Sequence, residues 1–182
     1  MPSRAIRAVK RRQAVRAGST RWRLRRIQTV NTNSTLDLNG LSPTFNGLQG
    51  GGTVDSLTGG AVTLTVGEND AFATFTGYIN NTAGSIALVK NGTGNQTLGG
   101  TNTYTGASTV SAGALRLSNA SALGSAGGAS VTAGAALELT GGISVTGQAL
   151  TLNGSGISSG GALRNITGSN SWAGNITLAS AS

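Results

Sequence analysis

Apolar and polar residues alternate in short segments along most of this 182-residue chain. Alternation with a period of two places the apolar side chains of a segment on one face, which is the pattern of a half-buried β-strand. Turn residues, mainly Gly, Asn and Ser, bound each segment and keep the strands short. The clearest segments are Leu36–Leu38, Val62–Val66, Leu115–Leu117, Leu137–Leu139, Ile143–Val145, Leu150–Leu152 and Ile176–Leu178. The pattern therefore predicts an all-β protein.

A longer period is suggested by four aromatic residues that each precede a glycine by two positions. They are Phe45, Phe75, Tyr104 and Trp172, and the intervals between them are 30, 29 and 68 residues. We interpret them as sharing one local environment in successive repeats. Repeats of about 20 to 50 residues are typical of a solenoid or a propeller, in which each unit buries its apolar face against the next. Strand spacing alone leaves a β-sandwich open, whereas the imperfect repeats and the many Asn, Thr and Ser residues favour a stacked coil.

The segment 90–117 holds a denser motif, in which Asn-Thr-Tyr-Thr-Gly at 102–106 is followed by Thr-Val-Ser-Ala-Gly-Ala-Leu at 109–115. It resembles the passenger-associated β-strand repeat of bacterial autotransporters, best over residues 88–117 and more loosely over 30–182. The resemblance implies a right-handed parallel β-helix, that is, a β-solenoid. Residues 95–98 depart from the repeat, so one inward position there is expected to be polar or shifted. The residues that carry the resemblance are Lys90, Gly92, Gly94, Leu98, Gly100, Asn102, Thr103, Tyr104, Thr105, Gly106, Val110, Gly113 and Leu115.

The resemblance also implies a function: a non-catalytic passenger segment, at the cell surface or secreted, that acts as a structural stalk or adhesin scaffold. Such passengers are exported by an outer-membrane β-barrel translocator. No such barrel follows in this sequence, so the chain is expected to be a fragment of a longer protein. The sequence shows no recognisable signal peptide and no apolar run long enough for a transmembrane helix. A host or matrix ligand is not identified, and end-to-end self-association through the end rungs is left open.

Charge divides the chain into two regions. Ten of the 13 basic residues lie within the first 26 positions, whereas the first acidic residue is Asp37. We expect residues 1–28 to form a disordered or weakly helical basic arm, and residues 29–182 to form the solenoid. The arm has three open explanations: an upstream stretch included by a wrong start site, a leader without function, or an arm that binds nucleic acid or an anionic membrane. Its cations are Arg4, Arg7, Lys10, Arg11, Arg12, Arg16, Arg21, Arg23, Arg25 and Arg26.

Candidate chemistry is sparse, because the chain has no His and no Cys. That composition excludes catalytic triads and common zinc sites, so we predict no enzyme, no cofactor and no metal site. Glu68 and Asp70 could pair as acid and base, although a solvated turn is the favoured interpretation. A polysaccharide-active β-helix enzyme, a lyase or a hydrolase, would need a cluster of acidic or basic groups on one face, and such groups are scarce. Tyr104 and Trp172 could form a sugar-stacking platform, but an internal stack is favoured. Lys90, Arg116 and Arg164 are expected to be exposed, and nucleic acid is the less favoured partner.

Overall fold

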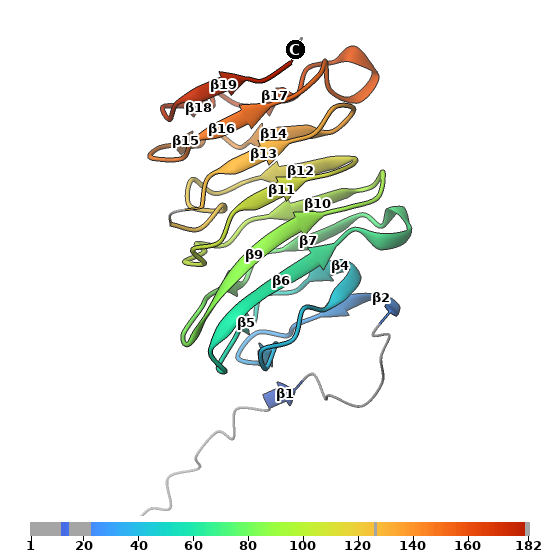
Figure 1. Cartoon of the computed structure of the whole chain (residues 1–182), viewed down its shortest axis with the longest axis vertical. Helices are drawn as coiled ribbons and strands as arrows, with labels where there is room; N and C mark the ends of the chain where they lie inside the picture. Colours follow the sequence, from blue (N-terminus) through green and yellow to red (C-terminus); the bar gives the residue numbers. More distant parts are fainter. Residues whose placement is uncertain (1–11, 15–22, 126, 181–182) are drawn as a thin grey trace, which may run out of the picture.

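The computed structural model describes residues 12–14, 23–125 and 127–180. Regular structure in these residues is almost entirely β-strand, and every strand pairing is parallel. The chain winds through about seven stacked coils, so strands from distant parts of the sequence lie side by side (Figure 1). The fold is the parallel β-solenoid expected from the sequence, and the β-sandwich is excluded.

The broadest face of the solenoid is an eight-stranded sheet with the strand order β19-β16-β13-β11-β9-β6-β4-β2. Each coil contributes one strand to it, so the backbone hydrogen bonds of this face run along the stack. Its strands are β2 (Arg23–Thr29), β4 (Thr44–Gln49), β6 (Gly60–Val66), β9 (Gly84–Lys90), β11 (Ser108–Val110), β13 (Ala129–Val131), β16 (Leu150–Leu152) and β19 (Ile176–Leu178).

A second face is a five-stranded sheet with the order β17-β14-β12-β10-β7. The chain reaches it from the first face through a turn in each coil, and the polar side chains of its strands point outward. Its strands are β7 (Ala73–Phe75), β10 (Asn95–Leu98), β12 (Ala114–Leu117), β14 (Ala136–Thr140) and β17 (Leu163–Thr167).

The third face is less regular and consists of a four-stranded sheet, β1-β3-β5-β8, and a two-stranded sheet, β15-β18. In the described part of the chain, residues 102–104 and 121–125 cross this face between β8 and β15 without forming strands. The strands are β1 (Arg12–Ala14), β3 (Thr35–Asp37), β5 (Thr53–Asp55), β8 (Tyr78–Ile79), β15 (Ser144–Val145) and β18 (Ser171–Trp172).

Two short 3-10 helices, η1 (Glu68–Asp70) and η2 (Ile157–Ser159), lie in connections between the first and second faces. No helix among the described residues has the length and apolar character needed to cross a membrane.

The register of the strands gives the length of one coil. Paired residues in neighbouring coils are 18 to 27 positions apart, for example Thr35 with Thr53, Gly60 with Gly84, and Ser144 with Ser171. This period differs from the interval of 29 or 30 residues between the aromatic residues. Unequal turns account for the variation, because insertions in a turn change the coil length without disturbing the strands.

The aromatic residues accordingly do not share one environment, and that interpretation was wrong. Phe45 lies on β4 of the eight-stranded sheet, and Phe75 lies on β7 of the five-stranded sheet. Tyr104 lies between strands, and Trp172 lies on β18 of the third face.

The core consists of side-chain columns that follow the register. One column on the eight-stranded sheet runs through Val66, Lys90, Val110, Val131 and Leu152, all of them buried. Strands in a sheet are about 4.8 Å apart, so each side chain in a column packs directly on those above and below it. Stacking of this kind gives a buried core to a chain whose strands are short and whose aromatic residues are few.

Strand β2 changes the boundary expected for the basic arm. It begins at Arg23 and pairs with β4, so residues 23–28 are a strand of the solenoid rather than disordered or helical. Arg12–Ala14 likewise form strand β1, which pairs with β3. A neighbouring coil offers backbone donors and acceptors to any extended segment, and this pairing outweighs a charge-rich composition. The remaining residues of the expected arm lie outside the described residues.

Candidate functional site

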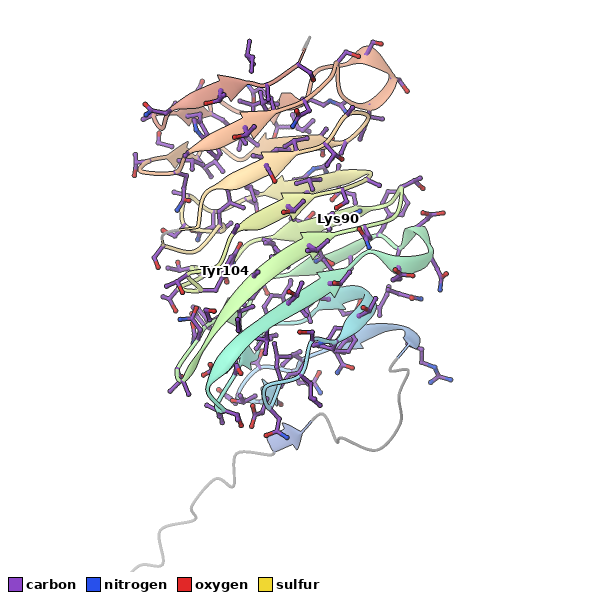
Figure 2. All side chains as sticks on the ribbon, in the orientation of Figure 1. Lys90 and Tyr104 are labelled. Carbon is purple, nitrogen blue, oxygen red and sulfur yellow. The ribbon has the colours of Figure 1, made fainter. Side chains whose placement is uncertain are left out.

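Lys90, one of the repeat residues and labelled in Figure 2, was expected to be exposed. It is instead buried, in a column between Val66 and Val110. Its Nζ donates hydrogen bonds to three backbone carbonyl oxygens, those of Asn91 (2.6 Å), Gly92 (2.9 Å) and Ala112 (3.1 Å). The first two carbonyls belong to the turn after β9, and the third belongs to the equivalent turn of the next coil. The lysine therefore joins two successive turns, and the carbonyl dipoles compensate the burial of its charge.

The glycines of the repeat lie where successive turns come closest. A Cβ atom at Gly100 would lie 1.7 Å from the carbonyl oxygen of Gly77 in the preceding coil. Gly92 and Gly113 also adopt φ values of +66° and +59°, which side chains rarely adopt. Cβ atoms at two further repeat positions would also lie within 2.5 Å of a carbonyl oxygen, at Gly94 and Gly106. These glycines let one turn pack directly on the backbone of another.

Asn102 replaces a missing strand on the third face. Its Oδ1 accepts a hydrogen bond from the N–H of Ile79 (2.8 Å), and its Nδ2 donates to the carbonyl of Ala122 (2.6 Å). Ile79 and Ala122 belong to the coils on either side, so one side-chain amide connects three coils where the described chain has no strand. Asn102 is buried, which makes these two hydrogen bonds more costly to lose than exposed ones.

Tyr104 is fully buried (Figure 2), and its hydroxyl pairs with the Ser108 hydroxyl at 2.7 Å. Burial raises the pKa of the tyrosine well above its usual value, an effect that the Ser108 hydrogen bond opposes. Tyr104 is therefore an internal residue and not part of an exposed sugar-stacking platform. Trp172 is partly buried and packs against the core.

The other repeat residues divide between the core and the surface. Leu98, Val110 and Leu115 are buried. Thr103 and Thr105 are exposed, and they bond to asparagine side chains of the preceding coil, Asn80 and Asn81 respectively. The structure thus brings the repeat residues together as one packed unit rather than as a surface site.

Gln96 is a structural residue that the sequence indicated only as a polar or shifted inward position. It is buried, and its side-chain amide forms two hydrogen bonds with the backbone of Leu48, at 2.9 Å and 2.8 Å. Leu48 lies two coils earlier, and the intervening residue of the column is Ala73. The short side chain of Ala73 leaves room for the glutamine to reach across it, a relation that only the register reveals.

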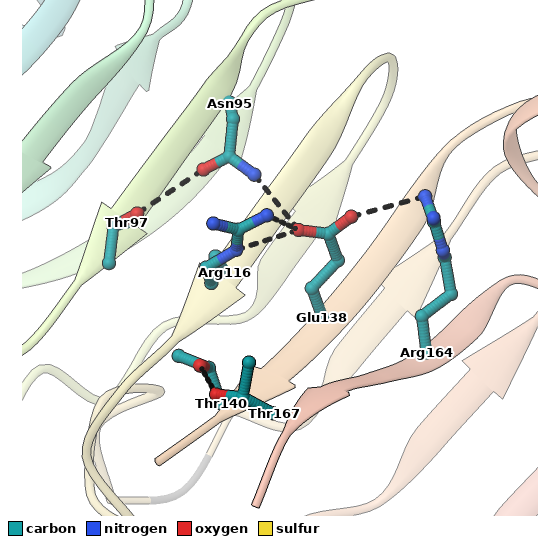
Figure 3. Close-up of polar contacts among 7 residues, drawn as sticks. All are labelled: Asn95, Thr97, Arg116, Glu138, Thr140, Arg164 and Thr167. Carbon is teal, nitrogen blue, oxygen red and sulfur yellow. Dashed lines mark hydrogen bonds and ion pairs between the residues drawn. The ribbon is translucent and has the colours of Figure 1, made fainter.

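A cluster of charged residues lies on the outer face of the five-stranded sheet (Figure 3). Glu138 Oε2 accepts hydrogen bonds from Arg116 Nε (2.8 Å) and Asn95 Nδ2 (3.0 Å) and pairs with Arg116 Nη2 (2.7 Å). Glu138 Oε1 pairs with Arg164 Nη1 (3.2 Å). We call Arg116, Glu138 and Arg164 the arginine row. The side chains of Arg116 and Arg164, expected to be exposed, are only 35% and 33% exposed, and Glu138 is buried.

The carboxylates considered for acid–base chemistry act in a turn. Glu68 and Asp70 lie on η1, and neither is buried. Asp70 Oδ1 accepts a hydrogen bond from the N–H of Thr93 (2.6 Å), and hydrogen bonds from Thr93 hold the pKa of Asp70 below its usual value. Among the described residues, no group of three or more His, Cys, Asp or Glu side chains could hold a metal ion.

Comparison with known proteins identifies a family match for the segment that holds these repeat residues. Residues 88–117 match the family model described as the passenger-associated-transport-repeat. The chain carries an autotransporter passenger repeat. Over 97 residues, 53% of its length, it is 41% identical to the protein named "Adhesin BmaC autotransporter" of Brucella suis biovar 1 (strain 1330). It spans only 3% of the length of that protein. No solved structure matches the chain.

The passenger repeat corresponds to one complete coil and the start of the next. Leu88 pairs with Ser108, so residues 88–107 make one turn of the solenoid. Residues 108–117 form β11 and β12 of the following coil. Some contacts between coils, such as that of Lys90 with the carbonyl of Ala112, lie wholly within the repeat, and others, such as that of Asn102 with Ile79, join it to a neighbouring coil. The repeat is therefore a stacking unit.

The buried lysine predicts an unusual dependence of stability on pH. Burial lowers the pKa of Lys90 from 10.5 to about 8, and Asp70 partly opposes this. Between about pH 8 and pH 10 the unfolded chain then binds more protons than the folded chain, so the free energy of unfolding rises with pH, by up to about 1.4 kcal/mol per unit. Above about pH 10 the raised pKa of Tyr104 reverses the trend, because the unfolded tyrosine ionises first.

Urea unfolding between pH 7.5 and pH 10 measures this effect, with Lys90→Met as the comparison. The variant is expected to lose the rise in stability between pH 8 and pH 10. An equal rise in both proteins would show that another group is responsible.

Proposed function

We propose that the chain is a non-catalytic segment of an autotransporter passenger, displayed at the cell surface as a stalk or adhesin scaffold. The observation that carries this proposal is that the passenger repeat forms one complete coil, bonded to the coils on both sides. Stacking such coils lengthens the molecule in one direction, and each added coil contributes a similar set of contacts. A structure of this kind suits a part that holds other surfaces away from the cell.

The proposal includes a partner outside this chain. An outer-membrane β-barrel translocator in the full-length protein would carry the passenger to the surface. The relative named as an adhesin supports the adhesive part of the proposal. The structure of the repeat supports the scaffold part, since its polar residues bond to neighbouring coils and thereby stabilise the stack.

Surface display tests the proposal directly. The chain is fused between a secretion signal and an autotransporter β-barrel, and the fusion is expressed in a bacterium with an outer membrane. We expect the chain to reach the surface of intact cells, where an antibody detects it and added protease cuts it slowly. The Gly100→Ala variant, which breaks a contact between coils, should be cut much faster. Retention of the wild-type chain in the periplasm, or equal cleavage of both proteins, would contradict the proposal.

A further inference from the structure

A groove on the second face is lined by Arg116 and Glu138 of the arginine row, and Arg164 lies beside it, paired with Glu138. Its volume is about 640 Å³. Its lining includes Phe72, Asn95, Thr97, Arg116, Glu138 and Ile157. None of these side chains takes part in the hydrogen bonds of Lys90, Asn102 or Tyr104 described above. The groove is therefore distinct from the buried contacts that Lys90, Asn102 and Tyr104 make.

Unequal turns produce the groove. The connections that lead into β10, β12 and β14 are short, at residues 91–94, 111–113 and 132–135. The connections into the outer strands β7 and β17 are longer, at 67–72 and 153–162, and they contain η1 and η2. These longer loops lie on either side of the shorter turns along the stack (Figure 1). They bring Phe72 and Ile157 into the lining of the groove, together with polar residues of the middle strands.

Two basic side chains beyond strand β2 lie at the groove, Arg116 in its lining and Arg164 beside it. Between residues 30 and 180 the sequence has only three basic residues, Lys90, Arg116 and Arg164, and Lys90 is buried. The two remaining cations face each other across the single carboxylate of Glu138 (Figure 3), which leaves one net positive charge. Arg116 uses Nε and Nη2 for Glu138, and Arg164 uses Nη1. A guanidinium has five N–H donors, so several donors remain for an anion.

The other lining groups favour a sugar over a peptide or a nucleic acid. Strands β10, β12 and β14 are paired on both sides, so an extended peptide finds no free backbone edge to pair with. One net positive charge is too little for the row of phosphates in a nucleic acid. The hydroxyl and amide groups of Thr97 and Asn95 suit sugar hydroxyls. The ring of Phe72, 75% exposed, suits the apolar face of a sugar ring.

We propose that this groove binds an acidic polysaccharide, with sugar carboxylates held by Arg116 in the groove and by Arg164 next to it, and with a sugar ring packed on Phe72. The arginines lie on β12 and β17, with β14 between them, so they are about 10 Å apart along the stack. An extended saccharide can place carboxylates along that direction. Glu138 holds both guanidinium groups in place while leaving their outer donors free. This proposal goes beyond the scaffold role and does not depend on it.

Calorimetric titration of the full chain with a hexamer of galacturonic acid tests the proposal. We expect measurable binding of the hexamer, and binding about tenfold weaker for Arg164→Gln, because a charge-assisted hydrogen bond is lost. Phe72→Ala should weaken binding about fivefold, through lost stacking. Two matched variants serve as controls and should bind as the wild type does. Arg26→Gln removes the same charge from exposed β2, and Tyr78→Ala removes an exposed aromatic residue from the third face.

Two further ligands separate the alternatives. A neutral galactose hexamer is expected to bind about tenfold more weakly than the acid hexamer. A hexamer of glutamic acid is expected to bind about as weakly as the neutral sugar, because it lacks sugar rings. Equal binding of the acidic peptide would overturn the assignment to a polysaccharide. Equal loss of binding in Arg26→Gln and Arg164→Gln would overturn the groove as the site.

Thermal unfolding of each variant separates this proposal from the scaffold role. Phe72 is exposed, so Phe72→Ala should unfold at the wild-type temperature whatever its effect on binding. If the acid hexamer does not bind a chain that unfolds normally, the groove proposal fails and the scaffold proposal stands.

Discussion

Gly100→Ala is expected to lower the free energy of unfolding by about 4 kcal/mol, at the upper end of the range for single substitutions. The added Cβ would lie 1.7 Å from the carbonyl oxygen of Gly77, a distance that no side-chain rotation can relieve because both atoms belong to the backbone framework. The two coils must separate locally, and the contacts on either side of Gly100 weaken with them. Unfolding in guanidinium chloride, followed by far-ultraviolet circular dichroism, measures the loss.

Gly59→Ala is the matched control for this prediction. A Cβ at Gly59 would meet its nearest neighbour, the carbonyl oxygen of Ala83, at 3.7 Å, which is an ordinary contact. The backbone there has no positive φ, so alanine fits. We expect a change within about 0.5 kcal/mol. If both substitutions have the same effect, glycine acts in this chain through the flexibility of the unfolded state and not through the close approach of coils.

Asn102→Ala is also expected to lower the free energy of unfolding by about 4 kcal/mol, for a different reason. The N–H of Ile79 and the carbonyl of Ala122 both lose the side chain that bonds them, and both lie in the interior of the stack. A buried polar group without a partner costs about 1–3 kcal/mol, and a small cavity adds to this. Because the asparagine connects three coils, the loss should spread to the coils on both sides.

Amide hydrogen exchange gives a readout specific to this contact. In Asn102→Ala, the amide of Ile79 should exchange much faster than in the wild type, while the amides of β13 and β16 keep their relative protection. Asn175→Ala is the control, since Asn175 is exposed and its side chain makes no hydrogen bond among the described residues. Uniform loss of protection throughout the solenoid would show that the chain unfolds as a whole and that the bridge has no local role.

These two predictions explain the residue types in the passenger repeat. A β-strand can be built from many sequences, but a turn that packs on another turn requires glycine, and a face without a strand requires a side chain that bonds as a backbone does. Gly100 and Asn102 meet these two requirements within three positions. We infer that the repeat specifies the contacts between coils, while the alternating segments specify the strands.

The sequence by itself determined the class of structure and the places of several strands. The alternating segments at Val62–Val66, Leu115–Leu117 and Leu150–Leu152 coincide with β6, β12 and β16, because alternation reports directly which face of a strand is buried. The passenger repeat at 88–117 was likewise evident from its residues. Local pattern was sufficient for these features because each depends on residues close together in the chain.

The tertiary structure alone decided the register, and with it the position of every side chain in a column. Lys90 is buried because its register places it between Val66 and Val110, and Gln96 reaches Leu48 because the residue between them is Ala73. The interpretation of the aromatic interval was wrong for the same reason. Because the turns differ in length, spacing in the sequence does not give the length of a coil. Contacts between residues 20 or more positions apart depend on how the coils stack, and that geometry belongs to the folded chain as a whole.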